Sequence, residues 1–249
     1  MQNDQIVEKF FETLITGNRP QARQLANGLH ANCGWTSTRL ITDLFWPTYE
    51  LLDRLYRADQ LGKLAHHTAT RLLRVLVDQN SIDLPKAPSN SRTVMAFCGP
   101  AEGDEMGAQM AVDLLEASGF AVTFSGGGIA NDEIMAQVNE LKPDVLLMFA
   151  SAPGDLPNIR SLIDNVREID ACPNMQFAVG AGVFNRAEGL AEEIGADLWA
   201  SSPLEMVDVL ITQPARRAGS EQRTVGKRAR KTAQGKQGEV RQEVRAEAA

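Results

Sequence analysis

Three carboxylates stand within four positions of the chain, just after a strongly apolar stretch. Glu102, Asp104 and Glu105 follow the run 93–98, TVMAFC. Carboxylates this close could bind a hard cation or raise one another's pKa. They could equally cap the first turn of a following helix, because they satisfy its free amides and oppose its dipole. The sequence leaves both roles open.

The three histidines all lie before residue 70, far from this acidic turn. No Ser/His/Asp or Cys/His arrangement can therefore be placed. His66 and His67 follow Tyr56 after nine residues. An aromatic ring can stack on a flat ligand, and an imidazole such as that of His67 can bind a metal. The alternative is that one histidine of the pair packs among helices while the other is solvated.

Cys98 ends the apolar run and could be a nucleophile or an attachment point for a chromophore. The simpler interpretation is a small packed side chain. The three cysteines stand far apart with no CxxC pair. This spacing indicates neither a disulfide framework nor a structural zinc site.

Two glycine-rich loops follow later apolar runs. Ser125 precedes Gly126-Gly127-Gly128, and Gly180 and Gly182 flank Ala181. Glycine lets backbone amides approach a flat or phosphorylated ligand closely, although it also serves tight turns.

Helices must position the histidines. Residues 1–80 carry four amphipathic patterns with short connections, which predict a four-helix bundle with a bend at Pro47. The segment 81–92 contains two prolines and several serines, so we expect a linker there.

A sheet must position the acidic turn and the glycine loops. Five apolar strands alternate with helical patterns over residues 93–212, which predicts an α/β domain with a flavodoxin-like five-stranded parallel sheet. Ligands of such sheets bind at the carboxyl ends of the strands. The expected strands are 93–98, 121–125, 145–149, 176–179 and 197–200, and the expected helices are 105–117, 132–141, 158–169, 186–194 and 204–211.

Charge divides the chain into an acidic body and a basic tail. The net charge is −7, but residues 213–249 carry ten Lys/Arg and four Asp/Glu. An acidic body repels nucleic acid, so only the tail, with KRARK at 227–231, could attract it or an acidic partner. The tail has too few apolar residues to order itself. The sequence shows no apolar run that could span a membrane, and we expect a cytoplasmic protein.

The order of elements resembles the cobalamin-binding module of methionine synthase, corrinoid methyltransferase subunits and light-sensing regulators that use adenosylcobalamin. In that family the first loop carries Asp-x-His-x-x-Gly, followed by Ser-x-Leu and then Gly-Gly. Here residues Glu102 to Gly107 correspond to the Asp-x-His-x-x-Gly motif. Phe149-Ala150-Ser151 follows after 41 residues, and Gly180-Ala181 follows Ser151 after 28. The resemblance covers about residues 35–211 and implies the same fold.

The resemblance also marks departures at the ligand. The family's cobalt-binding histidine falls on Asp104, the serine that bonds the displaced nucleotide base falls on Phe149, and the second glycine is Ala181. A carboxylate suits low-spin cobalt less well than an imidazole does. The light-sensing regulators carry a Trp that is followed after nine residues by Glu-His. The corresponding residues here are Tyr56 and, after nine residues, His66-His67.

We therefore expect a non-catalytic sensor or regulatory module that binds cobalamin or another tetrapyrrole between the bundle and the strand ends. A ligand-free interaction scaffold and a corrinoid carrier subunit of a methyltransferase are the alternatives. A protein partner is expected, a homo-oligomer is compatible, and His67 is the candidate metal ligand. The predicted ligand contacts are Tyr56, His66, His67, Glu102, Asp104, Gly107, Ser125, Gly126, Phe149, Ser151, Gly180 and Gly182.

Overall fold

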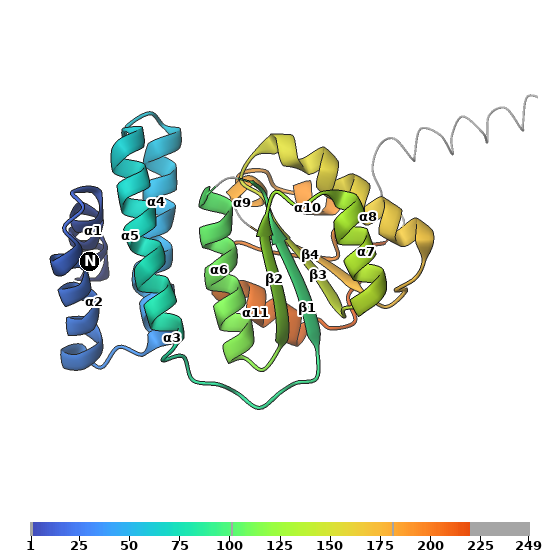
Figure 1. The fold of residues 1–249 in the computed structure, drawn as a ribbon, viewed down its shortest axis with the longest axis horizontal. Coiled ribbons are helices and arrows are strands. Elements are labelled where there is room, and N and C mark those ends of the chain that lie inside the picture. Colours follow the sequence, from blue (N-terminus) through green and yellow to red (C-terminus); the bar gives the residue numbers. More distant parts are fainter. Residues whose placement is uncertain (1, 101, 181, 220–249) are drawn as a thin grey trace, which may run out of the picture.

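The computed structural model describes residues 2–100, 102–180 and 182–219, and the basic stretch 227–231 lies outside them. The N-terminal part is a helical bundle (Figure 1). A π-helical turn, Ile41–Phe45, joins α3 to α4 without a break in the helical backbone, and Pro47 directly follows this turn, so the irregularity expected at Pro47 takes the form of a π-turn just before it. The helices are α1 (Gln2–Ile15), α2 (Arg19–Cys33), α3 (Ser37–Leu40), α4 (Trp46–Arg57) and α5 (Lys63–Ser81).

The second part is a five-stranded parallel sheet in the order β2-β1-β3-β4-β5. This is the flavodoxin-like order, so the predicted α/β class with an N-terminal helical bundle is confirmed. The strands are β1 (Thr93–Cys98), β2 (Ala121–Gly127), β3 (Val145–Phe149), β4 (Gln176–Gly180) and β5 (Leu198–Ala200). The helices are α6 (Glu102–Ala117), α7 (Asn131–Leu141), α8 (Leu156–Ile169), α9 (Gly182–Arg186), α10 (Leu190–Glu193) and α11 (Pro203–Thr212).

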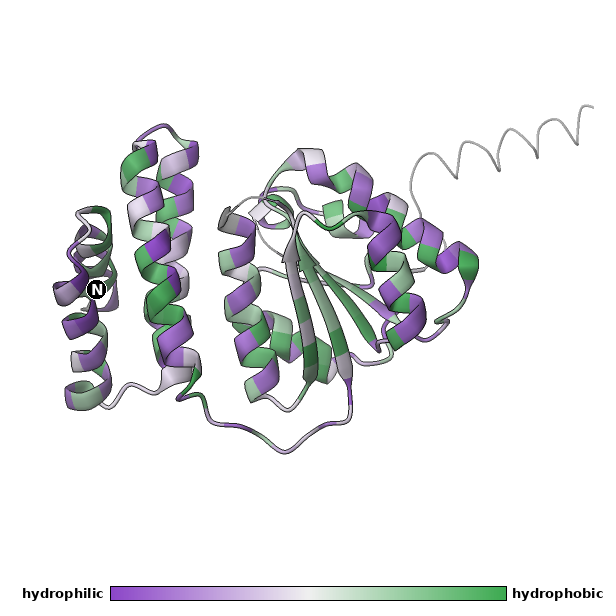
Figure 2. Cartoon of the chain, in the orientation of Figure 1, coloured by the Kyte–Doolittle hydropathy of each residue, from purple (hydrophilic) through white to green (hydrophobic). Residues whose placement is uncertain are grey.

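The two faces of the sheet belong to two apolar cores. The face toward α6 and α11, here called the bundle face, shares one core with the helical bundle. The face toward α7 and α8, here called the outer face, has a separate core. Figure 1 shows α6 standing between α5 and the sheet, and Figure 2 shows the inner strands as hydrophobic and the edge strand β2 as paler. The bundle thus packs on the α/β domain through α6.

The connecting segment 82–92 runs past the lower end of α6. The N–H of Ala87 donates to Ala117 O, and the N–H of Asn90 donates to Gly119 O. A Cβ on Gly119 would lie 2.2 Å from Pro88 O, and the φ of Gly119 is +89°, so only glycine fits this crossing.

Two segments differ from expectation. The helix expected over 186–194 is divided into α9 and α10, because Gly189 takes a φ of 79° between them. Residues 213–218, expected to begin the tail, lie against the sheet: the Gln176 amide donates to Gln213 O and Arg216 O, and the N–H of Ala218 donates to Asp197. No helix in the described residues is both long and apolar enough to cross a membrane.

Candidate functional site

A row of paired residues forms the carboxyl edge of the sheet. Cys98 of β1 pairs with Phe149 of β3, Phe149 pairs with Gly180 of β4, and Gly180 pairs with Ala200 of β5. Neighbouring strands lie about 4.8 Å apart, so residues distant in sequence meet here. This is the edge where ligands of α/β sheets bind.

The Phe149 side chain fills the space beside Gly180 on the bundle face. A Cβ built on Gly180 would lie 3.0 and 3.1 Å from two carbons of the Phe149 ring and 3.3 Å from the Met206 methyl group. Phe149 is only 4% exposed and belongs to the core shared with the bundle. The ring is therefore held between the sheet and α11.

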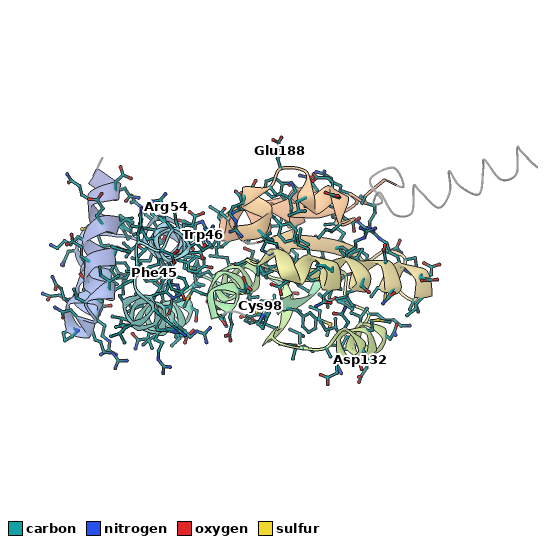
Figure 3. All side chains as sticks on the ribbon, turned by 90° about the horizontal axis from the view of Figure 1, so that it is seen from above. Phe45, Trp46, Arg54, Cys98, Asp132 and Glu188 are labelled. Carbon is teal, nitrogen blue, oxygen red and sulfur yellow. The ribbon has the colours of Figure 1, made fainter. Side chains whose placement is uncertain are left out.

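Little volume remains around this ring. The void lined by Trp46, Gly107, Phe149 and Met206 measures about 10 Å³. That is at or below the volume needed for one water molecule. A Cβ on Gly107 would lie 3.6 Å from the Trp46 ring, so Gly107 lets α4 approach α6 closely. Figure 3 labels Trp46 where the bundle meets the α/β domain.

Asp104 is fully buried in the first turn of α6, and neither of its carboxylate oxygens has a hydrogen-bond partner among the described residues. A Cβ built on Gly99 would lie 2.3 Å from Asp104 Oδ2 and 2.9 Å from Asp155 Oδ2, so both carboxylates crowd the same side of Gly99. Burial raises the pKa of Asp104 to about 6, Asp155 adds to the rise, and nearby Ser151 opposes it without completing a hydrogen bond. Asp104 thus does not cap the helix.

Polar residues of α4 stand over Asp104. Burial, together with the charges of Asp53 and Asp104, raises the pKa of Tyr49 above its usual range. Arg57 pairs with Asp53 at 2.7 Å. Tyr49, Asp53 and Arg57 were not predicted as site residues, although their i, i+4, i+8 spacing places them on one face of a helix.

A polar crevice opens between α4 and α9. It measures about 210 Å³, and its lining includes Arg54, Arg57, Asp53, Gly182 and Arg186. The Arg186 guanidinium donates to Ser151 O and so ties α9 to the end of β3.

Tyr56 and His66 stack on each other rather than on an open surface. Their ring centroids lie 4.0 Å apart at 18°, and His66 is 9% exposed. The ring of His67 meets that of His66 edge-on at 6.0 Å, and its residue is exposed. One histidine of the pair is thus packed and the other faces solvent. The described residues contain no group of three or more His, Cys, Asp or Glu that could hold a metal.

The remaining predicted residues fall into two groups. Gly107, Ser151, Gly180 and Gly182 lie around the α4 contact with Asp104 and Phe149. The exposed Ser125 and neighbouring Gly126 lie at the end of edge strand β2, where a Cβ on Gly126 would be 3.9 Å from Glu105 Oε1.

Glu102 is the first residue of α6, so the helix begins three residues earlier than expected. Burial raises the pKa of Cys98 to about 12, which keeps its thiol protonated at neutral pH and argues against a nucleophile.

These residues do not fit cobalamin bound with its nucleotide tail inserted. The position that the resemblance gives to a cobalt-binding imidazole holds a buried carboxylate at Asp104. The position of the tail holds Phe149, with a residual void of about 10 Å³. Both the lower ligand and the slot for the tail are lacking.

Comparison with known proteins agrees with the fold. Residues 92–208 match the family model described as B12 binding domain. Dimethylamine corrinoid protein 1 of Methanosarcina acetivorans is 25% identical over 126 residues, which is 50% of this chain and 58% of the relative, so the chain spans little more than half of that protein. The monomethylamine corrinoid protein of Methanosarcina barkeri superposes with a TM-score of 0.74 at 17% identity, over 84% of this chain and 98% of that one.

The matched segment 92–208 begins just before β1 and ends within α11. The structural match extends beyond it, since it covers 84% of the chain. The α/β part of this chain is therefore similar to the B12-binding domain family over residues 92–208.

Proposed function

We propose that the chain is a non-catalytic regulatory module of the B12-binding family, which acts by shifting its helical bundle against the α/β domain and thereby changing a surface for a partner protein. The observation that carries the proposal is the closed slot. Phe149 occupies it, and the bundle packs over it through Trp46. A protein whose tail slot is filled by its own side chain is poorly suited to carry cobalamin in the tail-inserted form.

Asp104 supports a movement of the bundle. An unpaired carboxylate under α4 destabilises the closed arrangement, and opening would return water to it. The rise of its pKa from 3.8 to about 6 corresponds to about 3 kcal/mol at neutral pH. A penalty of this size lowers the free energy that is needed to open the contact and hydrate the carboxylate.

A second candidate keeps a corrinoid or another tetrapyrrole as the signal. Similarity to the family favours it, and the relative from Methanosarcina acetivorans is named a corrinoid protein. The ligand would have to leave its tail outside the slot. Tyr56 would then leave its stack with His66 to cover the flat ring, and His67 would be the metal ligand. One version of this candidate is a corrinoid carrier subunit of a methyltransferase. Such a carrier would need the cobalt-binding histidine below the ring, and Asp104 stands in its place.

Visible spectroscopy separates the candidates. The purified chain is mixed with hydroxocobalamin, adenosylcobalamin, haem or biliverdin and passed through gel filtration. We expect no colour to stay with the protein. Retained cobalamin with a base-off spectrum would overturn the closed-slot proposal, and retained colour with a base-on, haem or biliverdin spectrum would favour the second candidate. The double variant Phe149→Ser, Asp104→His is the control, because it should retain cobalamin if the rest of the slot is intact.

Hydrogen exchange tests the proposed movement. Amides of α4 and the first turns of α6 should exchange through an opening that needs less free energy than global unfolding. Asp104→Asn should slow this exchange, and Asp113→Asn, which changes a buried carboxyl farther along α6, should leave the α4 amides unchanged. Exchange of α4 only by global unfolding in all three proteins would contradict the proposal.

A further inference from the structure

A pocket opens on the outer face of the sheet, opposite the closed slot. Its volume is about 290 Å³, and it lies at the carboxyl ends of β1 and β3, between α7 and α8. In a sheet with this strand order, β1 and β3 flank the topological switch point, where ligands bind. The apolar part of its lining includes Phe97, Ile134, Met148, Ile159 and Leu162.

The polar part of the lining is small and acidic. Among the described residues that line the pocket, Asp155 is the only charged side chain, and none of these residues is Lys, Arg or His. The Asn131 amide is engaged, since it donates to Asn158 O at 3.0 Å. Cys98 also contributes, with its thiol protonated. Any charge-based recognition in this pocket therefore depends on Asp155.

The Asp155 carboxylate lacks a counter-charge. Its Oδ2 is buried and has no hydrogen-bond partner among the described residues. The equally unpartnered Asp104 carboxylate lies beside it on Gly99. Two close carboxylates in a poorly solvated place attract a cation, which offsets their repulsion and their loss of hydration.

Helix dipoles do not reverse this preference. The N-termini of α7 and α8 both reach the pocket and would favour an anion. However, α7 already carries Asp132 and Glu133 in its first turn, and Asp155 itself directly precedes α8. These carboxylates offset the positive ends of both helices.

We propose that the outer pocket binds a small protonated amine with an apolar body about the size of one aromatic ring, with Asp155 as its counter-ion. The apolar walls exclude a fully hydrated metal ion, and the absence of basic lining residues disfavours carboxylates and phosphates. The site lies on the outer face, opposite the cobalamin slot, and the Asp104 carboxylate beside Asp155 is a feature that it shares with the regulatory proposal.

Titration of the full chain with 2-phenylethylamine tests the site. Amide chemical shifts should move at 128–134 and 155–162, while phenylacetate and potassium or magnesium ions alone should not move them. Loss of a charge-assisted hydrogen bond in Asp155→Asn should weaken amine binding about 10- to 100-fold. Equal binding of the amine and 2-phenylethanol would overturn the role of the charge, and tighter binding of phenylacetate would overturn the ligand class.

Two variants guard against indirect effects. Glu140→Gln removes an exposed carboxylate near the C-terminal end of α7, far from the helix N-terminus and outside the pocket lining, so affinity should stay unchanged. Ile159→Trp fills the pocket from its wall and should abolish binding while the thermal melt stays cooperative. Unchanged binding in a folded Ile159→Trp variant would place the amine elsewhere and overturn the proposal.

Discussion

The two faces of one sheet edge differ sharply in the space they leave. On the bundle face, the void beside Phe149 is about 10 Å³, whereas the pocket on the outer face is about 290 Å³. The same strands build both, since Phe149 points to the bundle face and its neighbour Met148 to the outer face. One large side chain at the end of β3 thus fills the space beside it on the bundle face, where open volume remains in the crevice of about 210 Å³ between α4 and α9.

Phe149→Ala should have the largest effect on stability, because it empties the filled space on the bundle face. Removing a fully packed ring should lower the free energy of unfolding by about 3 to 5 kcal/mol. Ile159→Ala, in the half-open wall of the outer pocket, should cost less than half as much. Urea denaturation of both variants measures this, and equal losses would mean that the two faces are packed equally well.

Asp104→Asn should stabilise the bundle face in a manner that depends on pH. The folded-state pKa of Asp104 is about 6 and its ordinary value is 3.8, so the ionised group destabilises the fold fully above pH 6 and not at all below about pH 4. The variant should gain about 2 to 3 kcal/mol over the native chain at pH 7.5, and the gain should vanish near pH 4. Denaturation at a series of pH values measures the difference, and a gain that does not change with pH would contradict the assignment.

Gly180→Ala should lower the free energy of unfolding only because its new methyl group meets the Phe149 ring. Its Cβ would press on the Phe149 ring, and overpacking of this kind costs about 1 to 3 kcal/mol. Gly154→Ala is the matched control, because no atom lies within 4 Å of its added Cβ. In a Phe149→Ala background the cost at Gly180 should disappear, and additive losses would show that the two residues do not interact.

Glu105→Gln should have the smallest effect. Glu105 pairs with Arg74 of α5 at 2.8 Å, and both side chains are about a third or more exposed. Such a pair contributes about 0 to 1 kcal/mol and is screened by salt. The loss should shrink further in 1 M NaCl, and a loss above 2 kcal/mol would assign the bundle contact to this ion pair rather than to packing.

The fold could be predicted because it rests on local periodicity. The alternation of apolar runs and amphipathic helices placed all five strands to within two residues at either end. The prediction of one helix over 186–194 was wrong, because the left-handed backbone of Gly189 interrupts it. The pattern of apolar residues carries no information on this backbone conformation.

The site was less predictable because it depends on tertiary packing. Phe149 and Asp104 were found from motif spacing, but the stacking of Tyr56 on His66 was not, since both residues come from different helices. Tyr49 and Asp155 gave no signal of their own. Their roles arise from the approach of α4 and of the segment before α8 to one buried carboxylate.

The position of α6 has a practical consequence for cutting the chain. Met106 and Met110 of α6 are fully buried in a core that continues from the bundle into the sheet. A fragment of residues 92–219 would lack the bundle, so the side of α6 that the bundle covers would be exposed as an apolar, aggregation-prone surface. The helical bundle thus shields the apolar surface of α6 from solvent. Any protein that displaces the bundle must cover this surface with apolar residues of its own.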